Sequence, residues 1–232
     1  YAVPEAAKFL RGRTIGLDPG HGGDTGDKTV EATANLKVAL LLEEFLKASG
    51  AKVLLTRRAD VAVLLGRRPE MMQRAGAEVF VSLHHDAATR DSANRTSTWY
   101  HLEADREPAN LDLARAVQRR IADVLRTPLT VPTPLMSDNV RYKNKGFAVL
   151  RRANIPAILC EASFYTNSNE RLRLSKPSYL KRQAYGYFLG LVDYFRAGTP
   201  KAVLKTAKVK AGGKVELSLL LDDGLKSRGG YG

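Results

Sequence analysis

The sequence predicts an α/β fold, in which a layered sheet carries helices on both faces. Short apolar runs alternate along the chain with longer segments whose apolar residues recur at helical spacing. Such alternation is typical of layered α/β domains. Three of the apolar runs also end in a histidine or an acid, and in these folds reactive groups collect at the carboxyl ends of strands. Fold class and candidate site are therefore expected to coincide at one edge of a sheet.

The first elements follow directly from local chemistry. Residues 14–18 form an apolar run that Pro19-Gly20 ends, so a buried strand is expected there. Leucines at helical spacing predict a helix over 34–49, and Gly50 stops it. The remaining expected strands cover 53–56, 79–84, 96–101 and 157–161, and the remaining expected helices cover 63–75, 110–125 and 178–196.

Two details qualify these elements. Pro69 indicates a bend or a late start in the helix over 63–75. The strand over 96–101 is polar at alternate positions, so we expect it nearer a sheet edge. Segments 87–95 and 127–146 lack periodicity and are expected to be loops, of which the second is long enough for a functional loop.

The C-terminal residues differ from the rest. Apolar and polar residues alternate around Gly212-Gly213, which predicts a β-hairpin. An isolated hairpin is marginally stable at best, so this tail either adds to a neighbouring sheet or begins a truncated second domain. The expected organisation is an N-terminal extension over 1–12, a main domain over 13–198 and a β-rich tail over 199–232.

Composition bounds the class of protein. Lys and Arg number 37 against 24 Asp and Glu, which leaves a net charge of +13 in 232 residues. That excess favours an anionic partner, such as nucleic acid, an acidic cell-wall polymer or anionic lipid headgroups. No apolar run approaches the roughly 20 residues of a spanning helix, so no transmembrane segment is expected. Because the chain starts at Tyr1 instead of Met, we expect a processed or chosen boundary there, at which a removed export signal would leave no trace.

The first candidate metal ligand is His21, in the run Asp18-Pro19-Gly20-His21-Gly22-Gly23 that follows the first strand. Glycines let the backbone bend tightly and a ligand approach closely, although the run could equally be a plain turn. A phosphate loop is disfavoured because no Gly-Lys-Ser/Thr follows. A calcium loop built from Asp18, Asp24 and Asp27 fails the required spacing.

His84 and His85 end a strongly apolar strand. Successive strand residues point to opposite faces, so one metal ligand is expected from this pair; the alternative is a hydrogen-bonded surface histidine. Glu31 lies just before the first long helix, and on position alone a helix cap is the better interpretation.

Glu161 is the least ordinary acid, because it ends an apolar strand and buried carboxyls are either salt-bridged or functional. We favour a functional role. Cys160 is expected to point into the core as a small hydrophobic residue and not to act as a nucleophile. It is the one cysteine in the chain, so an internal disulfide is impossible. A single cysteine does not decide whether the protein works in an oxidising or a reducing compartment. His101 has no partner in the sequence pattern and receives no role.

Taken together, these motifs resemble the zinc-dependent N-acetylmuramoyl-L-alanine amidases of the bacterial cell wall, the amidase type 3 family. The resemblance runs in order from about residue 13 to 196 and does not cover 199–232. Its residues are the run Ile15–Gly23, Glu31 with Asn35-Leu36, Val53–Arg57 with Asp60, the Arg67 region, Val81–Ala87, and Pro156–Glu161 with Phe164 and Asn167.

The resemblance implies a mixed, mostly parallel twisted sheet in three layers, and a catalytic domain over 13–198. It also implies cleavage of the amide joining N-acetylmuramic acid to L-alanine. By family pattern His21, Glu31 and His84 would bind one Zn2+ per chain, and Glu161 would be the catalytic acid/base. For Glu31 this replaces the helix-cap interpretation, and it selects His84 over His85. A zinc-activated water is the nucleophile expected of such sites.

The expected partners are peptidoglycan or muropeptides, with anionic wall polymers as further partners suited to the positive surface. The expected location is outside the cytoplasm, in the periplasm or cell envelope of a bacterium. Two alternatives stay open: a zinc peptidase that acts on another amide, and a non-catalytic peptidoglycan-binding relative. A nucleic-acid binder has only the charge in its favour and no recognised motif, so no specific nucleic acid is expected.

Overall fold

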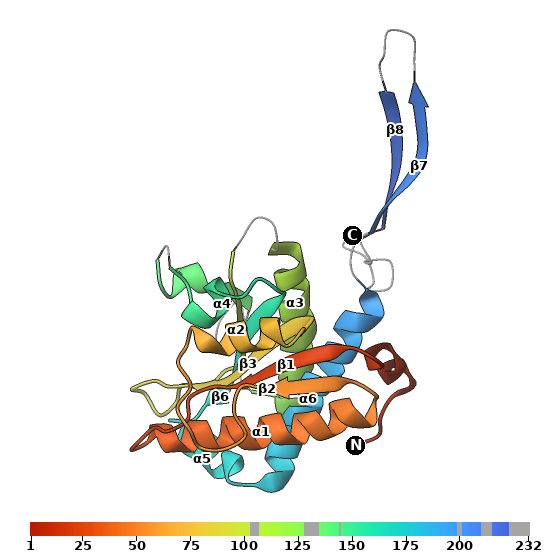
Figure 1. Cartoon of the computed structure of the whole chain (residues 1–232). Helices are drawn as coiled ribbons and strands as arrows, with labels where there is room; N and C mark the ends of the chain where they lie inside the picture. Colours follow the sequence, from red (N-terminus) through yellow and green to blue (C-terminus); the bar gives the residue numbers. More distant parts are fainter. Residues whose placement is uncertain (103–106, 128–134, 144, 199–200, 210–214, 223–232) are drawn as a thin grey trace.

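The computed structural model describes residues 1–102, 107–127, 135–143, 145–198, 201–209 and 215–222. Its centre is a six-stranded sheet in the order β2-β1-β3-β6-β4-β5 (Figure 1). Strands β1, β2, β3 and β6 run parallel, whereas β4 is antiparallel to β6 and parallel to β5. The sheet is therefore mixed and mostly parallel, as expected. Its strands are β1 (Thr14–Pro19), β2 (Lys52–Leu55), β3 (Val79–Asp86), β4 (Ser97–Tyr100), β5 (Leu135–Ser137) and β6 (Ala157–Phe164).

Helices cover both faces of this sheet. One core cluster joins α1 (Lys28–Ala48), α3 (Glu107–Leu125) and α6 (Pro177–Ala197) to alternate residues of β1, β3 and β6. A second, smaller cluster joins α2 (Arg67–Arg74) and α4 (Ala148–Arg151) to the strand residues that point to the opposite face of the sheet, such as Phe80 and Leu159. Because successive strand residues alternate faces, one buried strand serves both layers. The three-layer expectation is confirmed.

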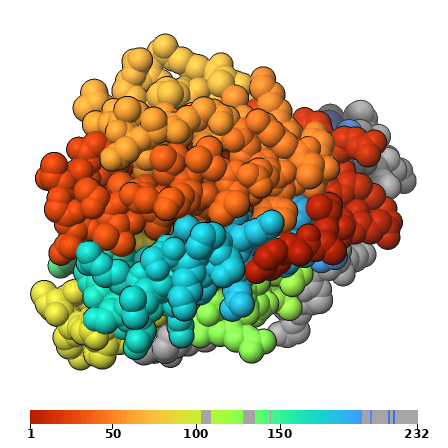
Figure 2. All heavy atoms as spheres, turned by 90° about the horizontal axis from the view of Figure 1, so that it is seen from below, coloured from red at the N-terminus to blue at the C-terminus, as the bar shows by residue number. Residues whose placement is uncertain are grey.

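Two shorter elements complete the larger layer. The 3-10 helix η1 (Glu5–Leu10) packs on α6, and α5 (Ser168–Leu174) lies between β6 and α6 in the chain. Figure 2 shows this side of the molecule, with α1 in orange beside α6 in cyan to blue and the N-terminal residues in dark red. Within the described part of the chain, no helix combines the length and the apolar character that a bilayer crossing requires.

The observed helix ends show which sequence signals predicted a boundary correctly and which did not. Helix α1 stops at Ala48, and Gly50 follows with φ of 82°, as expected for a glycine stop. Its start at Lys28 precedes the expected 34, because the first turn carries mostly polar residues that give no apolar periodicity. Helix α2 starts at Arg67, since Pro69 is tolerated only in a first turn.

The segment 127–146 is not a plain loop, which corrects the expectation. It contains β5 (Leu135–Ser137) and the 3-10 helix η2 (Asp138–Val140), while 128–134 and 144 lie outside the described residues. A three-residue strand is too short to give a period-two signal. Strand β4 consequently lies one strand inside the edge that β5 forms, with Thr96, Ser97 and Thr98 fully buried.

The tail forms β7 (Lys201–Val209) and β8 (Val215–Asp222), which pair antiparallel in a two-stranded sheet of their own (Figure 1). The expected hairpin is thus observed in its two strands. It does not extend the six-stranded sheet. The expected turn at Gly212-Gly213 lies outside the described residues.

Close packing of α3 on α6 gives a stability prediction. A Cβ at Gly190 would lie 2.7 Å from the Cα of Val117 on α3. Gly190→Ala should therefore force the helices apart and lower the free energy of unfolding by about 1–3 kcal/mol, even though alanine favours a helix by about 1 kcal/mol over glycine. Urea unfolding measures this change.

The matched control is Arg182→Ala, an alanine at an exposed position of the same helix, which should change stability by less than about 0.5 kcal/mol. A Gly190→Ala protein more stable than the parent would show that the interface has room for a methyl group.

Candidate functional site

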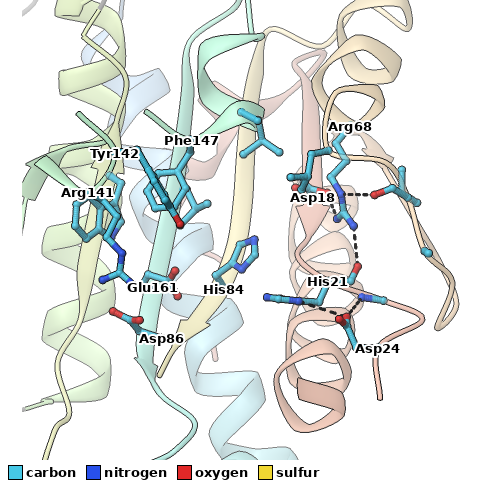
Figure 3. A pocket seen from close by; sticks show the side chains of 18 residues that line it. Asp18, His21, Asp24, Arg68, His84, Asp86, Arg141, Tyr142, Phe147 and Glu161 are labelled. Carbon is cyan, nitrogen blue, oxygen red and sulfur yellow. Dashed lines mark hydrogen bonds and ion pairs between the residues drawn. The ribbon is translucent and has the colours of Figure 1, made fainter. Parts of the chain in front are cut away.

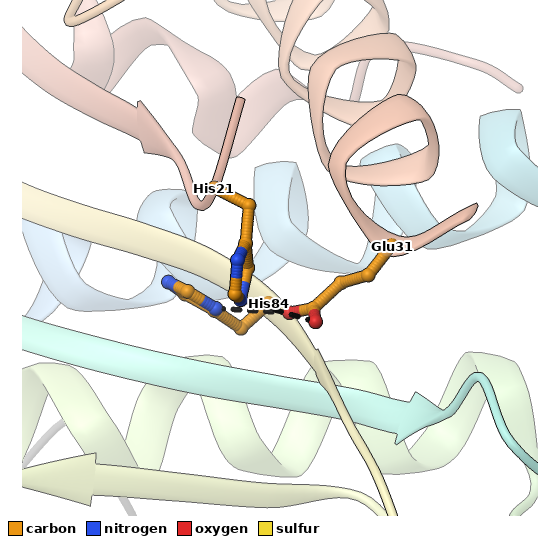
Figure 4. Close-up of side chains that lie close together, drawn as sticks. All are labelled: His21, Glu31 and His84. Atoms are coloured by element: carbon orange, nitrogen blue, oxygen red, sulfur yellow. Dashed lines mark hydrogen bonds and ion pairs between the residues drawn. The ribbon is translucent and has the colours of Figure 1, made fainter. Parts of the chain in front are cut away.

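The structure brings together the three residues that the sequence singled out as ligand candidates. His21 follows β1, His84 lies in β3 and Glu31 lies in the first turn of α1. His21 Nε2 is 3.1 Å from Glu31 Oε2, and His84 Nδ1 is 3.0 Å from Glu31 Oε1. One ligand atom from each residue lies within 4.8 Å of the others (Figure 4). We call these three residues the His–Glu–His cluster.

Glu31 is buried and its carboxylate contacts both imidazoles from one side, so a role limited to helix capping is excluded. Burial alone would raise the pKa of its carboxyl, but hydrogen bonds and charge from His21 and His84 outweigh it and hold the pKa well below its usual range. The same hydrogen bond raises the pKa of His21, against the opposing effect of burial. The cluster therefore consists of one buried carboxylate that faces two partly buried imidazoles.

The turn that carries His21 is held by two buried arginines. Arg57 donates from Nε to the carbonyl of Pro19 at 2.8 Å, and from Nη2 to the carbonyls of Gly20 and Ala32 at 2.8 Å each. Arg68 donates from Nη2 to the carbonyl of His21 at 2.9 Å. Three consecutive carbonyls of the turn thus accept from guanidinium groups, and we call this pair of residues the arginine clamp.

The clamp holds a backbone that a histidine rarely adopts. His21 has φ of 62°, in the left-handed region, which costs a non-glycine residue free energy unless its surroundings impose it. Burial and the nearby charge of Arg68 lower the pKa of Arg57, which shows that bringing the two guanidinium groups together is itself unfavourable.

Asp18 offsets this charge from inside the sheet. Its fully buried carboxylate accepts from Arg68 Nη1 at 2.9 Å and Thr56 Oγ1 at 2.6 Å through Oδ1, and from Ser82 Oγ at 2.7 Å through Oδ2. Every partner is a hydrogen-bond donor, so Asp18 is an internal counter-ion to the clamp. This is why Asp18 cannot serve as a calcium ligand in the turn that follows it.

Gly20 is required by the position of His84. A Cβ at residue 20 would lie 2.1 Å from His84 Nε2. The absence of a side chain therefore lets the His84 ring lie directly against the turn, beside His21. This is the close approach that the glycine-rich sequence suggested.

His85 points to the other face of β3, as the alternation of strand residues requires. It is buried and lies between α1 and α6, with Nδ1 2.8 Å from Asn35 Oδ1 and Nε2 3.1 Å from Gln183 Nε2. Because the Asn35 amide nitrogen donates to the Gly20 carbonyl, Asn35 Oδ1 accepts and His85 carries its proton on Nδ1. Burial lowers the pKa of His85 and keeps it neutral.

This network on the far face also fixes Glu31. The backbone N–H of His85 donates to Glu31 Oε1 at 3.1 Å, and Asn35 Nδ2 lies 3.5 Å from the same oxygen. His85 is thus a buried partner that orients a member of the cluster and not a member itself.

Glu161 faces the cluster from the neighbouring strand, since its Cα pairs with that of His84 across β3 and β6. Burial, with the charges of Glu31 and Asp86, raises the pKa of Glu161 well above its usual range, against the attraction of Arg141 and Arg95. Its Oε2 is enclosed and has no hydrogen-bond partner among the described residues. Glu161 is therefore a carboxyl beside the cluster whose burial favours the protonated state.

A cavity of about 440 Å³ opens between these groups. In Figure 3, His21, Asp24 and Arg68 lie on one side of it and Arg141, Tyr142 and Asp86 on the other, with His84 and Glu161 between them. Apolar and aromatic side chains complete the lining, namely Ala62, Val63, Leu65, Trp99, Phe147, Ala148, Val149 and Leu159.

Two other candidates take structural positions. Cys160 is fully buried in the larger core cluster, as expected, and burial raises its pKa to about 11. His101 is buried, with Nδ1 3.0 Å from both carboxylate oxygens of Asp138. No sequence pattern indicated that partner, because Asp138 lies in the segment expected to be a loop.

The sequence pattern missed three residues of the site. Asp86 follows His84 by two positions in the same strand, a spacing that predicts a shared face. Arg68 was indicated only indirectly, because the family resemblance included the region around Arg67. Arg141 lies in the aperiodic segment, where no local signal marks a cavity-lining residue.

Comparisons with known proteins agree on one family. Its model, described as N-acetylmuramoyl-L-alanine amidase (Amidase_3), matches residues 15–193. N-acetylmuramoyl-L-alanine amidase LytC of Bacillus subtilis (strain 168) is 30% identical over 189 residues, which are 80% of this chain and 36% of LytC. N-acetylmuramoyl-L-alanine amidase AmiC of Escherichia coli O6:H1 is 31% identical over 239 residues, which are 86% of this chain and 57% of AmiC. The chain therefore spans well under two thirds of these curated relatives.

Solved structures agree with the fold. The crystal structure of N-acetylmuramoyl-L-alanine amidase from Clostridium difficile 630 is 28% identical with a TM-score of 0.69, covering 81% of this chain and 99% of that one. The catalytic domain of the amidase CwlV from Bacillus (Paenibacillus) polymyxa is 28% identical with a TM-score of 0.66, covering 78% and 97%.

The arginine clamp gives a matched pair of substitutions. Arg57→Lys keeps the charge but cannot reach all four carbonyls that the planar guanidinium contacts, those of Pro19, Gly20, Ala32 and Ala59. We expect a loss of about 1–3 kcal/mol in unfolding free energy, and faster hydrogen exchange in residues 19–26. Arg58→Lys is the control, because Arg58 is exposed and pairs with Glu43 instead. Equal exchange in both variants would contradict the clamp.

Cys160 gives a prediction about reactivity. A thiol with pKa raised to about 11 and no exposure should react with a thiol reagent at pH 8 only as fast as the protein unfolds. Labelling should therefore be slow in buffer and rapid in denaturing urea, followed by mass spectrometry of the one cysteine. Rapid labelling of the native protein would reopen the question of a reactive cysteine.

Proposed function

This chain belongs to the family of N-acetylmuramoyl-L-alanine amidases, and from that premise we propose that it hydrolyses the amide between N-acetylmuramic acid and L-alanine of peptidoglycan. The observation that carries the proposal is the His–Glu–His cluster facing the half-buried Glu161 across a cavity. A site of this kind has the parts that metal-assisted amide hydrolysis needs: three ligands, an open side and a separate proton carrier.

The donor set of the cluster fits zinc. Two imidazoles and one carboxylate are the ligands of several catalytic zinc sites, which keep a further position open. Members of this family are typically zinc-dependent, and we propose that His21, Glu31 and His84 hold one Zn2+ per chain. A zinc ion bound there would supply Lewis acidity, which lowers the pKa of a water and polarises the amide carbonyl.

Neighbouring residues support this assignment. Asp24 lies 3.4 Å from His21 Nδ1, on the ring nitrogen opposite the one that faces Glu31. Second partners of this kind fix the orientation of a ligating histidine. Gly20 and the arginine clamp keep the two imidazoles side by side, so the site is organised before an ion arrives.

Glu161 is proposed as the catalytic acid/base. Its carboxyl faces the cavity next to His84 and has an oxygen without a hydrogen-bond partner among the described residues. In the reaction it accepts a proton from the attacking water and delivers that proton to the amine of the leaving L-alanine. The surrounding carboxylates and burial favour the state in which Glu161 holds the proton.

The setting of the enzyme follows from the same proposal. Peptidoglycan lies outside the bacterial cytoplasm, so we propose that the protein works in the cell envelope or periplasm on peptidoglycan or muropeptides. Its net charge of +13 suits stem-peptide carboxylates and anionic wall polymers. We further propose that residues 13–198 are the catalytic domain, preceded by an extension over 1–12 and followed by a separate β-rich part over 199–232.

The direct test combines metal analysis with product analysis. We expect one zinc per chain and release of stem peptide from purified peptidoglycan that a chelator abolishes and added zinc restores. Mass spectrometry should place the cut at the muramoyl–alanine bond. Zinc without cleavage would indicate a peptidoglycan-binding relative, and cleavage of another amide would indicate a peptidase.

Two isosteric substitutions separate metal binding from proton transfer. Glu31→Gln should weaken zinc binding by more than about a hundredfold. Loss of a direct ligand should cost more than the roughly ten- to hundredfold loss that follows removal of a residue hydrogen-bonded to a ligand. Glu161→Gln should keep one zinc per chain and lower kcat by about 100- to 10,000-fold, the range for general acid–base catalysis. Competition with a zinc chelator and peptide release measure the two effects.

Each variant serves as the control for the other, because both replace a carboxyl group by the isosteric amide within the same site. The assignment fails if Glu161→Gln loses zinc while Glu31→Gln retains it, or if Glu161→Gln turns over at the parental rate.

A further inference from the structure

The wall of the cavity beyond Glu161 is built on a buried aspartate. Asp138 is fully buried and its carboxylate lies 3.0 Å from His101 Nδ1, while Oδ2 accepts from the backbone N–H of Phe147 at 2.7 Å. Its carbonyl accepts from the backbone N–H groups of Arg141 and Tyr142 at 3.0 Å each. The turn that follows η2 is thus fixed at both ends by one residue.

Aromatic contacts stiffen the same wall. The ring of Phe147 packs edge-on against Trp99 of β4 at 5.7 Å and against Tyr142 at 5.3 Å. Both contacts are T-shaped, a favourable geometry for aromatic pairs. The backbone of Arg141 is therefore held in place at the cavity, although its side chain is exposed.

Arg141 differs from the other arginine of the cavity lining. The guanidinium of Arg68 donates hydrogen bonds to Asp18 and to the carbonyls of Val63, Pro19 and His21. Arg141 makes no side-chain hydrogen bond or ion pair with any residue that the structure describes, and it lines the cavity together with Glu161 and Asp86. Figure 3 shows its side chain directed toward these two carboxyl groups. It therefore offers a complete set of guanidinium donors to a ligand.

The proposed reaction fixes which end of the substrate lies there. Glu161 returns its proton to the amine of L-alanine, so the leaving peptide must extend on the Glu161 side of the cluster. Arg141 lies on that side and His21 lies on the other. In the common stem peptide, D-isoglutamate follows L-alanine and carries a free α-carboxylate a few bonds beyond the scissile amide.

Resting on the proposed function, we infer that Arg141 is a specificity-determining residue that binds the α-carboxylate of the second stem residue. A planar guanidinium matches a carboxylate with two parallel hydrogen bonds, which a lysine cannot reproduce. The carboxyl groups of Asp86 and Glu161 lie beside the guanidinium on the same side of the cavity, so the Arg141 side chain points toward the place where the peptide leaves. The enzyme should accordingly prefer a stem with isoglutamate to one in which the same position is amidated to isoglutamine.

The test uses two soluble N-acetylmuramoyl tripeptides that differ only at the second residue, isoglutamate or isoglutamine, with the zinc-loaded full chain. The parent should show a KM at least about tenfold lower for isoglutamate, as expected for hydrogen bonds to a charged group, with a similar kcat for both. Arg141→Gln should raise the KM for isoglutamate to the value for isoglutamine and thereby remove the discrimination. Arg141→Lys should retain only part of it.

Lys143→Gln is the matched control, since it removes one exposed positive charge from the same segment outside the cavity lining; it should leave the discrimination intact. Equal KM values for both substrates in the parent would overturn the inference, as would discrimination that survives in Arg141→Gln. If Arg141→Gln changes only the pH profile, Arg141 acts as a counter-ion to Glu161 and the inference is also overturned. Failure of the parent to cleave either substrate at the muramoyl–alanine bond would instead count against the proposed function.

Discussion

The buried ion pair between Asp18 and Arg68 is the interaction on which the site depends. Arg68 joins the inside of the sheet to the carbonyl of His21, and Arg57 holds the two preceding carbonyls of the same turn. A buried pair of this kind adds little net stability compared with apolar packing, but removing one partner leaves an uncompensated charge. Its contribution is geometric: it holds His21 in a left-handed conformation beside His84.

Sheet topology supplies the rest of the geometry. Parallel neighbours β1, β3 and β6 end at the same edge, so residues that are far apart in the chain meet there. The register of β3 against β6 sets Glu161 directly across from His84, close to the cluster but outside it. The separate positions of the cluster and of Glu161 therefore follow from strand pairing. The other face of β3 buries His85 against α1 and α6.

Sequence patterns could predict the parts of this site that strands carry. An apolar run followed by His84 or Glu161 indicates both the strand and a polar group near its carboxyl end, and the alternation of faces separates His84 from His85. Glu31 could not be placed this way, because the first turn of α1 gives no apolar periodicity, and only the family resemblance identified it. Arg68 contacts the sheet from α2, and Arg141 reaches the cavity from the turn that follows η2. Tertiary placements of this kind leave no local pattern. Strand β5 was missed because a strand of three residues is too short to show the alternation of apolar and polar residues.

The most direct measurement is an anomalous difference map, recorded at the zinc absorption edge from crystals of the zinc-loaded protein. We predict a single peak bound by His21, Glu31 and His84, with Glu161 facing it without coordinating. A peak bound by Glu161 in place of Glu31, or by Asp18 or His85, would contradict the division of roles between the cluster and its neighbours.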